Sequence, residues 1–276
     1  MALILDKTYL NETCGLSCIE NYLIYILRAN NFPYRYLYGG SVKTFSEIVE
    51  YFVREKANYS TFYLIDRLHT IARKNNFIRI YSSDELDFGV SETYSCVMVD
   101  EAFINAKYKT KLMRPDHYML LTEADSDIYY INDTPRDIDK ISREELLGIY
   151  AGNTISFEIV GYPSDEQKSE IINNFKTDVA QVKAAELKEV DSIEAARDIV
   201  GIYRALLKRN YYFSLLFCVT EFMQDYIKYL DKAYMNIEYM RLRGKGEISE
   251  INKILGEIND KDIVITEKLR KAVCAE

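Results

Sequence analysis

The sequence predicts an α+β protein, with helices and an antiparallel sheet in a first domain and helices alone in a second. Apolar residues recur at helical spacing up to residue 74, and strand-like segments follow between residues 77 and 160. From Ser164 onward the pattern is helical again, and no proline occurs after Pro163. We therefore expect two domains, residues 1–163 and 164–276.

Composition narrows the class of protein. Hydrophobic residues make up 48% of the 276 residues, which is enough for a sizeable core. The net charge of −8 argues against general nucleic-acid binding, which needs a basic face. Five cysteines without repeated spacing indicate neither a disulfide framework nor a zinc site. No apolar run is long enough to span a bilayer and no signal peptide is evident, so a cytoplasmic protein without membrane contact is expected.

A cysteine opens the first predicted helix. Residues 11–18 read NETCGLSC, and apolar residues at spacings of three and four follow them as far as Leu27. We expect Thr13 to cap this helix and Cys14 to lie in its first turn, where backbone N–H groups and the helix dipole favour a thiolate. Gly15 leaves space beside the sulfur. Cys14 is therefore a candidate nucleophile, provided that a histidine reaches it.

The next elements alternate between helix and strand. We expect helices over residues 44–55 and 60–74, and strands over 77–81 and 94–99. One of the two histidines of the chain, His69, lies in the second of these helices, where it is interpreted as a surface or partly buried residue.

A hairpin is the strongest strand signal. Residues 117–123 and 128–133 read as strands around a polar turn, and Thr134-Pro135 is expected to end the second one. A short helix with an acidic first turn begins at Ser142, and a further strand covers 155–160.

The rest of the chain is predicted to be helical, and Gly244-Lys245-Gly246 is its clearest break. We expect helices near 165–186, 192–208, 211–242 and 247–258, and a last one near the C-terminus.

The hairpin brings the second histidine next to an acidic residue. A tight turn near residues 125 and 126 pairs residues whose numbers add up to about 250 or 251, which sets His117 opposite Asp133 or one residue away. A carboxylate beside an imidazole fixes its tautomer and orients it as a base. A register slip of one residue would make Asn132 the orienting residue instead. Together with Cys14, these residues predict a nucleophile, a base and an orienting group.

These segments resemble papain-like cysteine enzymes, and above all the bacteriocin-leader peptidase-like group. The similar pieces are CGLSC at 14–18, His117-Tyr118 at the start of a strand, NDTP at 132–135, and SREEL at 142–146. The resemblance covers about residues 1–161. It implies a papain-like first domain, with Cys14 as nucleophile, His117 as base and Asp133 as the orienting residue.

One position departs from the family pattern. Family peptidases usually have a glutamine six residues before the cysteine, which helps to bind the oxyanion, and this chain has Thr8 there. Asn11 is the nearest amide, and the backbone N–H of Cys14 can supply a second donor.

The helical second half resembles soluble acyltransferases and amide synthases of natural-product pathways. It has neither long apolar runs nor a phosphate-binding glycine loop, as a transporter or an ATPase domain would. The resemblance implies that Cys14 takes an acyl group from a thioester on a phosphopantetheine-bearing acyl carrier protein and passes it to a small amine. No metal or other cofactor is expected. Two alternatives stay open, a peptidase or amidase with the same residues, and an inactive papain-like protein that binds a ligand or a partner.

A basic segment precedes the predicted base. It holds Lys107, Lys109, Lys111 and Arg114, in which the three lysines alternate as on one face of a strand or loop. One interpretation is a docking patch for an acidic carrier protein, and the other is a solvated edge protected by lysines. A second candidate patch consists of Arg241, Arg243 and Lys245. The remaining cysteines, Cys18, Cys96, Cys218 and Cys274, are interpreted as packing or tail residues.

Overall fold

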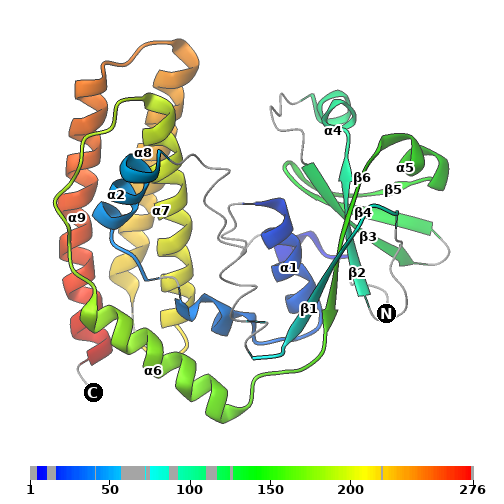
Figure 1. The fold of residues 1–276 in the computed structure, drawn as a ribbon, viewed down its shortest axis with the longest axis horizontal. Coiled ribbons are helices and arrows are strands. Elements are labelled where there is room, and N and C mark those ends of the chain that lie inside the picture. The colour runs from blue at the N-terminus through cyan, green and yellow to red at the C-terminus, as the bar shows by residue number, and fades with distance from the viewer. Residues whose placement is uncertain are drawn as a thin grey trace. The chain divides into compact units, whose positions relative to one another are not determined.

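The computed structural model describes residues 5–10, 17–40, 42–56, 72, 75–86, 93–109, 117–124, 127–218 and 220–274. Helices and one six-stranded antiparallel sheet make up the described chain, which confirms the predicted α+β class (Figure 1). In the described ranges, no helix combines the length and the apolarity needed to cross a membrane.

The chain divides into two compact units. The sheet unit consists of Met1–Tyr34 and Leu68–Pro163, and the helical unit of Arg35–Arg67 and Ser164–Glu276. The division after Pro163 coincides with the predicted domain boundary, but the earlier segment 35–56 belongs to the helical unit, which the sequence did not indicate.

The sheet has the strand order β1-β6-β2-β3-β4-β5. All neighbouring strands are antiparallel. The predicted hairpin is present as β3 and β4, and the sequence missed β5 because Thr134-Pro135, which reads as a terminator, is the turn between β4 and β5. The strands are Ile78–Ser83 (β1), Thr93–Val99 (β2), His117–Ala124 (β3), Asp127–Asp133 (β4), Arg136–Ile141 (β5) and Tyr150–Ile159 (β6).

One face of the sheet packs against two short helices. Val97, Met119 and Tyr130 form a buried core with Ile104 of α4 and Leu146 of α5. These helices span Glu101–Tyr108 and Arg143–Ile149. The predicted basic segment therefore begins on a helix rather than on a strand, and the short helix after the hairpin is capped by Ser142 as expected.

The other face of the sheet is covered by α1, Cys18–Ala29, which contacts β2, β3 and β4. The seven residues of α1 that are buried include the apolar run from Tyr22 to Leu27, so the predicted amphipathic helix is confirmed. A short 3₁₀ helix, η1 (Lys7–Leu10), lies against α1 and β5.

The helical unit is built on three long helices that run side by side, α7, α8 and α9 (Figure 1). Its elements are η2 (Tyr34–Gly40, of which all but Tyr34 belongs to this unit), α2 (Phe45–Glu55), α6 (Asp165–Gln181), α7 (Ile193–Ser214), α8 (Glu221–Arg243) and α9 (Ile248–Cys274). The predicted helix 211–242 is instead the end of α7 followed by α8, because no glycine or proline marks the break between them. The two helices expected after residue 246 form a single helix, α9.

Helix α2 joins the helical unit through its apolar face. Phe45 packs edge-on against Tyr203 of α7, and the hydroxyl of Ser46 accepts a hydrogen bond of 2.9 Å from the backbone N–H of Ala185. A capping box between Thr44 and Glu47 fixes the start of this helix. These contacts explain why the segment belongs to the helical unit although the sheet unit precedes and follows it in sequence.

A buried carboxylate of α9 links this helix to α2 and α7 by hydrogen bonds. Asp262 is 1% exposed, accepts a hydrogen bond of 2.9 Å from the N–H of Phe45, and accepts another from the hydroxyl of Tyr203. Burial raises the pKa of Asp262 to about 6, although these two hydrogen bonds lower it, and the nearby Glu47 adds to the rise.

We expect this carboxylate to make stability depend on pH. The folded protein binds the proton of Asp262 more tightly than the unfolded chain does. The contribution of this proton to the free energy of unfolding is therefore complete below about pH 4 and is lost as the pH rises through about 6. The loss corresponds to roughly 3 kcal/mol at most. In urea unfolding between about pH 4 and 7, Asp262→Asn should flatten this pH dependence relative to Asp260→Asn, an exposed residue of the same helix. Identical pH dependence in the two variants would contradict the assignment.

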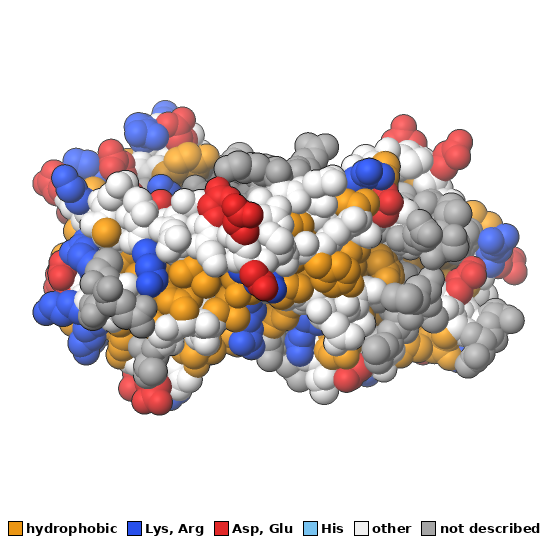
Figure 2. All heavy atoms as spheres, turned by 90° about the horizontal axis from the view of Figure 1, so that it is seen from below, with side chains coloured by type: hydrophobic (Ala, Val, Ile, Leu, Met, Phe, Trp, Pro, Cys, Tyr) orange, Lys and Arg blue, Asp and Glu red, His pale blue; other side chains and the backbone are white. Residues whose placement is uncertain are grey.

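Exposed hydrophobic side chains occur at several places on the surface. Figure 2 shows one face of the molecule, on which hydrophobic side chains lie between basic and acidic ones. Single exposed apolar residues are normal on protein surfaces, so only a set aligned on one element carries information.

Candidate active site

The predicted base lies at the first position of β3. His117 is 8% exposed, and its Nε2 lies 2.6 Å from Oδ1 of Asn132, a fully buried residue of β4. In the described part of the chain, no hydrogen bond to Nδ1 of His117 is formed. Among the described residues, the ring is therefore held through Nε2 alone.

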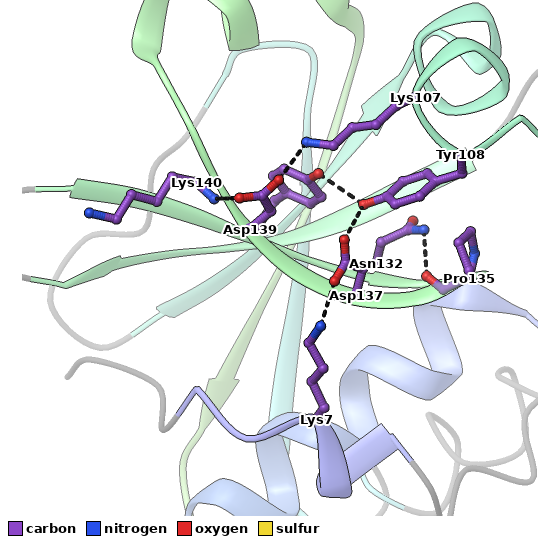
Figure 3. Close-up of polar contacts among 9 residues, drawn as sticks. Lys7, Lys107, Tyr108, Asn132, Pro135, Asp137, Asp139 and Lys140 are labelled. Carbon is purple, nitrogen blue, oxygen red and sulfur yellow. Dashed lines mark hydrogen bonds and ion pairs between the residues drawn. The ribbon is translucent and has the colours of Figure 1, made fainter.

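The backbone after β4 decides which nitrogen of His117 carries the proton. Nδ2 of Asn132 donates a hydrogen bond of 2.9 Å to the carbonyl oxygen of Pro135 (Figure 3). Because a carbonyl oxygen can only accept, the amide must turn its Oδ1 toward the imidazole. Nε2 of His117 then donates to Asn132, and Nδ1 keeps the lone pair that can take a proton from a nucleophile.

The strand register explains why Asn132, and not Asp133, meets the histidine. Leu120 pairs with Ile131 and Leu121 with Tyr130, so paired residue numbers add up to 251 in this hairpin. A direct pairing of His117 with Asp133 would need a sum of 250. Since side chains alternate along a strand, Asn132 lies on the face of His117, and the expected contact between His117 and Asp133 is replaced by the one-residue alternative.

Asp133 instead connects the hairpin to α1. One carboxylate oxygen accepts a hydrogen bond of 2.7 Å from Nδ2 of Asn21. The hydroxyl of Tyr22 donates to the carbonyl oxygen of Tyr118 at 2.7 Å and accepts from the backbone N–H of Asp133 at 3.2 Å. Burial raises the pKa of Asp133, although the hydrogen bond from Asn21 and the charge of His117 lower it. The carboxylate thus fixes the first turn of α1 to the strand end that carries Asn132.

Sequence reasoning missed Asn21, Tyr22 and Pro135. Asn21 gave no signal in the sequence, because on a helical wheel it lies opposite the apolar stripe that includes Leu23 and Ile26. The other two act through a buried hydroxyl and a backbone carbonyl, which no pattern of residue types reveals.

The nucleophile predicted from the sequence, Cys14, lies outside the described residues, as do Thr13, Asn11 and His69. The described helix begins at Cys18 with Ser17 as its N-cap, whose hydroxyl accepts from the N–H of Glu20 at 3.3 Å. The helix thus starts four residues beyond Cys14, and the predictions that Thr13 caps it and that Cys14 lies in its first turn were wrong, because Ser17 supplies the cap.

Two other cysteines lie behind the hairpin, on the side of α1. Cys18 is half-buried and Cys96 is fully buried, and neither forms a disulfide. Burial raises the pKa of the Cys96 thiol well above its usual value, and the neighbouring Cys18 and Asp133 add to the rise. Cys96 therefore stays protonated and unreactive, in agreement with its interpretation as a packing residue.

The basic segment before His117 is only partly available for docking. Lys107 forms an ion pair of 2.8 Å with Asp139 (Figure 3). Its Nζ lies 4.8 Å from the centre of the Tyr130 ring. Lys109 is exposed beyond the end of α4, while Lys111 and Arg114 lie outside the described residues. Lys107 is therefore engaged within the sheet unit, and the prediction for Lys111 and Arg114 falls outside the described residues.

A polar network continues from this ion pair toward the hairpin. The hydroxyl of Tyr108 lies 2.9 Å from that of Tyr130 and donates to Asp137 at 3.1 Å. Lys7 of η1 forms an ion pair of 2.6 Å with the same carboxylate (Figure 3). This network attaches the segment immediately before residues 11–16 to β5. Among the described residues, no group of three or more histidine, cysteine or acidic side chains is arranged to hold a metal ion.

Comparison with protein-family models gave no matching family, and comparison with curated proteins gave no significant match.

Proposed function

We propose that this protein is a cysteine-dependent acyltransferase that forms an amide from a thioester-bound acyl group. The observation that carries the proposal is the chain of hydrogen bonds from His117 through Asn132 to Pro135, which leaves Nδ1 of the imidazole as a proton acceptor. Cys14 is the proposed nucleophile, and Asn132 takes the orienting role that was predicted for Asp133. Asp133 is proposed to keep α1 in place behind them.

The proposed reaction has two halves that share one base. Nδ1 of His117 takes the thiol proton of Cys14, the thiolate attacks the thioester carbonyl, and the donor leaves as a thiol with the proton returned by His117. The amine then attacks the acyl-enzyme, a C–N bond forms, the C–S bond breaks, and the amine proton passes through His117 to Cys14. A thioester and an amine thus give an amide and a thiol, with no oxidant or cofactor required.

The choice of a thioester over a peptide follows from the weak oxyanion site. Thr8 stands where peptidases of this kind have a glutamine, which leaves Asn11 and the backbone N–H of Cys14 as proposed donors. A thiolate is a far better leaving group than an amine. The first half-reaction therefore needs less oxyanion stabilisation with a thioester than with a peptide bond.

The test is to supply an acyl thioester with and without a primary amine. We expect intact-protein mass spectrometry to show an acyl-enzyme when the amine is omitted, and product analysis to show the amide when it is added. If the acyl-enzyme is hydrolysed by water and does not react with the amine, and a peptide library is cleaved, the protein is a peptidase or amidase. No adduct with any thioester and no peptide cleavage would identify an inactive binding protein.

A further inference from the structure

Helix α8 carries an apolar stripe whose side chains are exposed to solvent. Met235, Tyr239 and Leu242 are 63%, 52% and 69% exposed, and they follow one another at spacings of four and three residues. Residues at this spacing lie on one face of a helix. The three large side chains therefore share one face of α8, which distinguishes them from single exposed apolar residues.

The stripe is bordered by positive charge at both ends. Lys232 lies one turn before Met235, and Arg243 and Lys245 follow Leu242, all three of them exposed. The guanidinium of Arg243 stacks at 4.3 Å from the centre of the Tyr239 ring. Within the fully described stretch 220–274, neither Lys232 nor Lys245 forms an ion pair. We call Lys232, Met235, Tyr239, Leu242, Arg243 and Lys245 the α8 stripe.

The two acidic residues between positions 231 and 245 are already paired with basic side chains. Asp231 pairs with Arg204 and Lys208 of α7, at 3.3 and 3.4 Å. Glu238 binds Arg241 with two hydrogen bonds of 2.7 Å each. Arg241, which the sequence placed in the second candidate patch, is therefore used internally, while Arg243 and Lys245 keep their charge at the surface.

We propose that the α8 stripe binds an acidic amphipathic helix of a partner protein. In a chain of net charge −8, a surface with three exposed basic residues around an apolar centre selects a negatively charged partner. From residue 232 to 243 the stripe spans about 17 Å, the length of a helix of three turns. The identification of this partner as the acyl carrier protein rests on the proposed function. The preference of the surface for an acidic amphipathic helix does not depend on that function.

Binding of a designed peptide tests the surface directly. The probe is a stapled amphipathic helix of about 18 residues, with leucines on one face and glutamates beside them, and its counterpart has lysines instead. We expect the full-length protein to bind the acidic peptide in fluorescence anisotropy, and to bind it more weakly as salt rises from about 50 to 500 mM. Equal binding of the lysine peptide would overturn the proposal.

Paired variants separate charge from apolar contact. Lys232→Glu with Arg243→Glu should weaken binding at least about tenfold at low salt, and Met235→Ser with Leu242→Ser should weaken it at all salt concentrations. The matched control is Lys253→Glu with Lys268→Glu, which makes the same charge change at exposed positions of α9. Unchanged binding in both stripe variants would overturn the proposal. So would a dimer, detected by sedimentation, that dissociates on Met235→Ser with Leu242→Ser.

A kinetic comparison distinguishes this proposal from the function on which part of it rests. The charge-reversed stripe variant should raise the KM for a donor bound to an acidic carrier protein and leave the KM for a small free thioester unchanged. An unchanged KM for the carrier-bound donor would reject the carrier as partner while the acyltransferase stands. If the wild-type protein used no thioester, the proposed acyltransferase function would be rejected. The peptide experiment would still decide whether the α8 stripe binds an acidic helix.

Discussion

Replacing Cys14 by alanine should abolish acyl transfer. The residue is the proposed covalent nucleophile, and removal of a nucleophile that acts in a unit with its base typically costs at least about 10⁴-fold in rate. Intact-protein mass spectrometry should show the acyl adduct on the wild type and not on the variant. Iodoacetamide at neutral pH should label Cys14 first, because an activated thiol is largely a thiolate under these conditions and an ordinary thiol is mostly protonated.

Cys18→Ala is the matched control for this result. It removes a thiol four residues away, at the first position of α1 and behind its Ser17 cap. Most activity should remain, and the acyl adduct should form at the wild-type level. An adduct that survives Cys14→Ala and disappears in Cys18→Ala would move the nucleophile to the start of the helix, leaving His117 and Asn132 in their proposed roles.

His117→Ala should reduce the rate by about 10² to 10⁴-fold, the usual cost of losing a general base. Asn132→Ala should reduce the rate less, because the imidazole is still present and only loses the hydrogen bond that fixes its tautomer. We expect kcat to fall in both variants, while the KM for a small thioester changes little, since neither side chain is proposed to bind the acyl group. His69→Ala should be close to neutral.

The same series separates Asn132 from Asp133. Asp133→Asn keeps a carbonyl oxygen that can accept from Asn21 and should retain most activity. Asp133→Ala leaves the half-buried amide nitrogen of Asn21 without this partner and should lower stability by about 1 kcal/mol. If Asp133→Asn proved as inactive as His117→Ala while Asn132→Ala stayed active, the orienting residue would be Asp133, as the sequence first indicated.

The sequence was sufficient to predict the hairpin, but not to distinguish Asn132 from Asp133 as the hydrogen-bond partner of His117. Two strands and a polar turn are local features, and they were enough to place His117 beside residues 132 and 133. The choice between the two depends on a shift of one residue, which exchanges the faces of a strand. That shift is set by side chains distant in sequence, such as Asn21 and Tyr22 of α1, which bind the side chain and the backbone of Asp133.

The same distinction applies to the domains and to the basic segments. Periodicity identified α2, but its place in the helical unit depends on contacts of Phe45 with Tyr203 and Asp262. These two residues lie more than 150 residues further along the chain. Charge along the sequence marked Lys107 and Arg241 as docking residues, yet each is paired with an acidic side chain in the fold.

What the sequence determined by itself was the α+β class, most of the helices and strands, and the one histidine on a hairpin, because these depend on periodicity and turn residues close together in the chain. What only the tertiary structure decided was the partner of that histidine, the nitrogen that carries its proton, and the residues whose charge stays exposed. Each of these is a contact between segments distant in sequence, and a single strand or helix contains no information about the neighbour that will cover it.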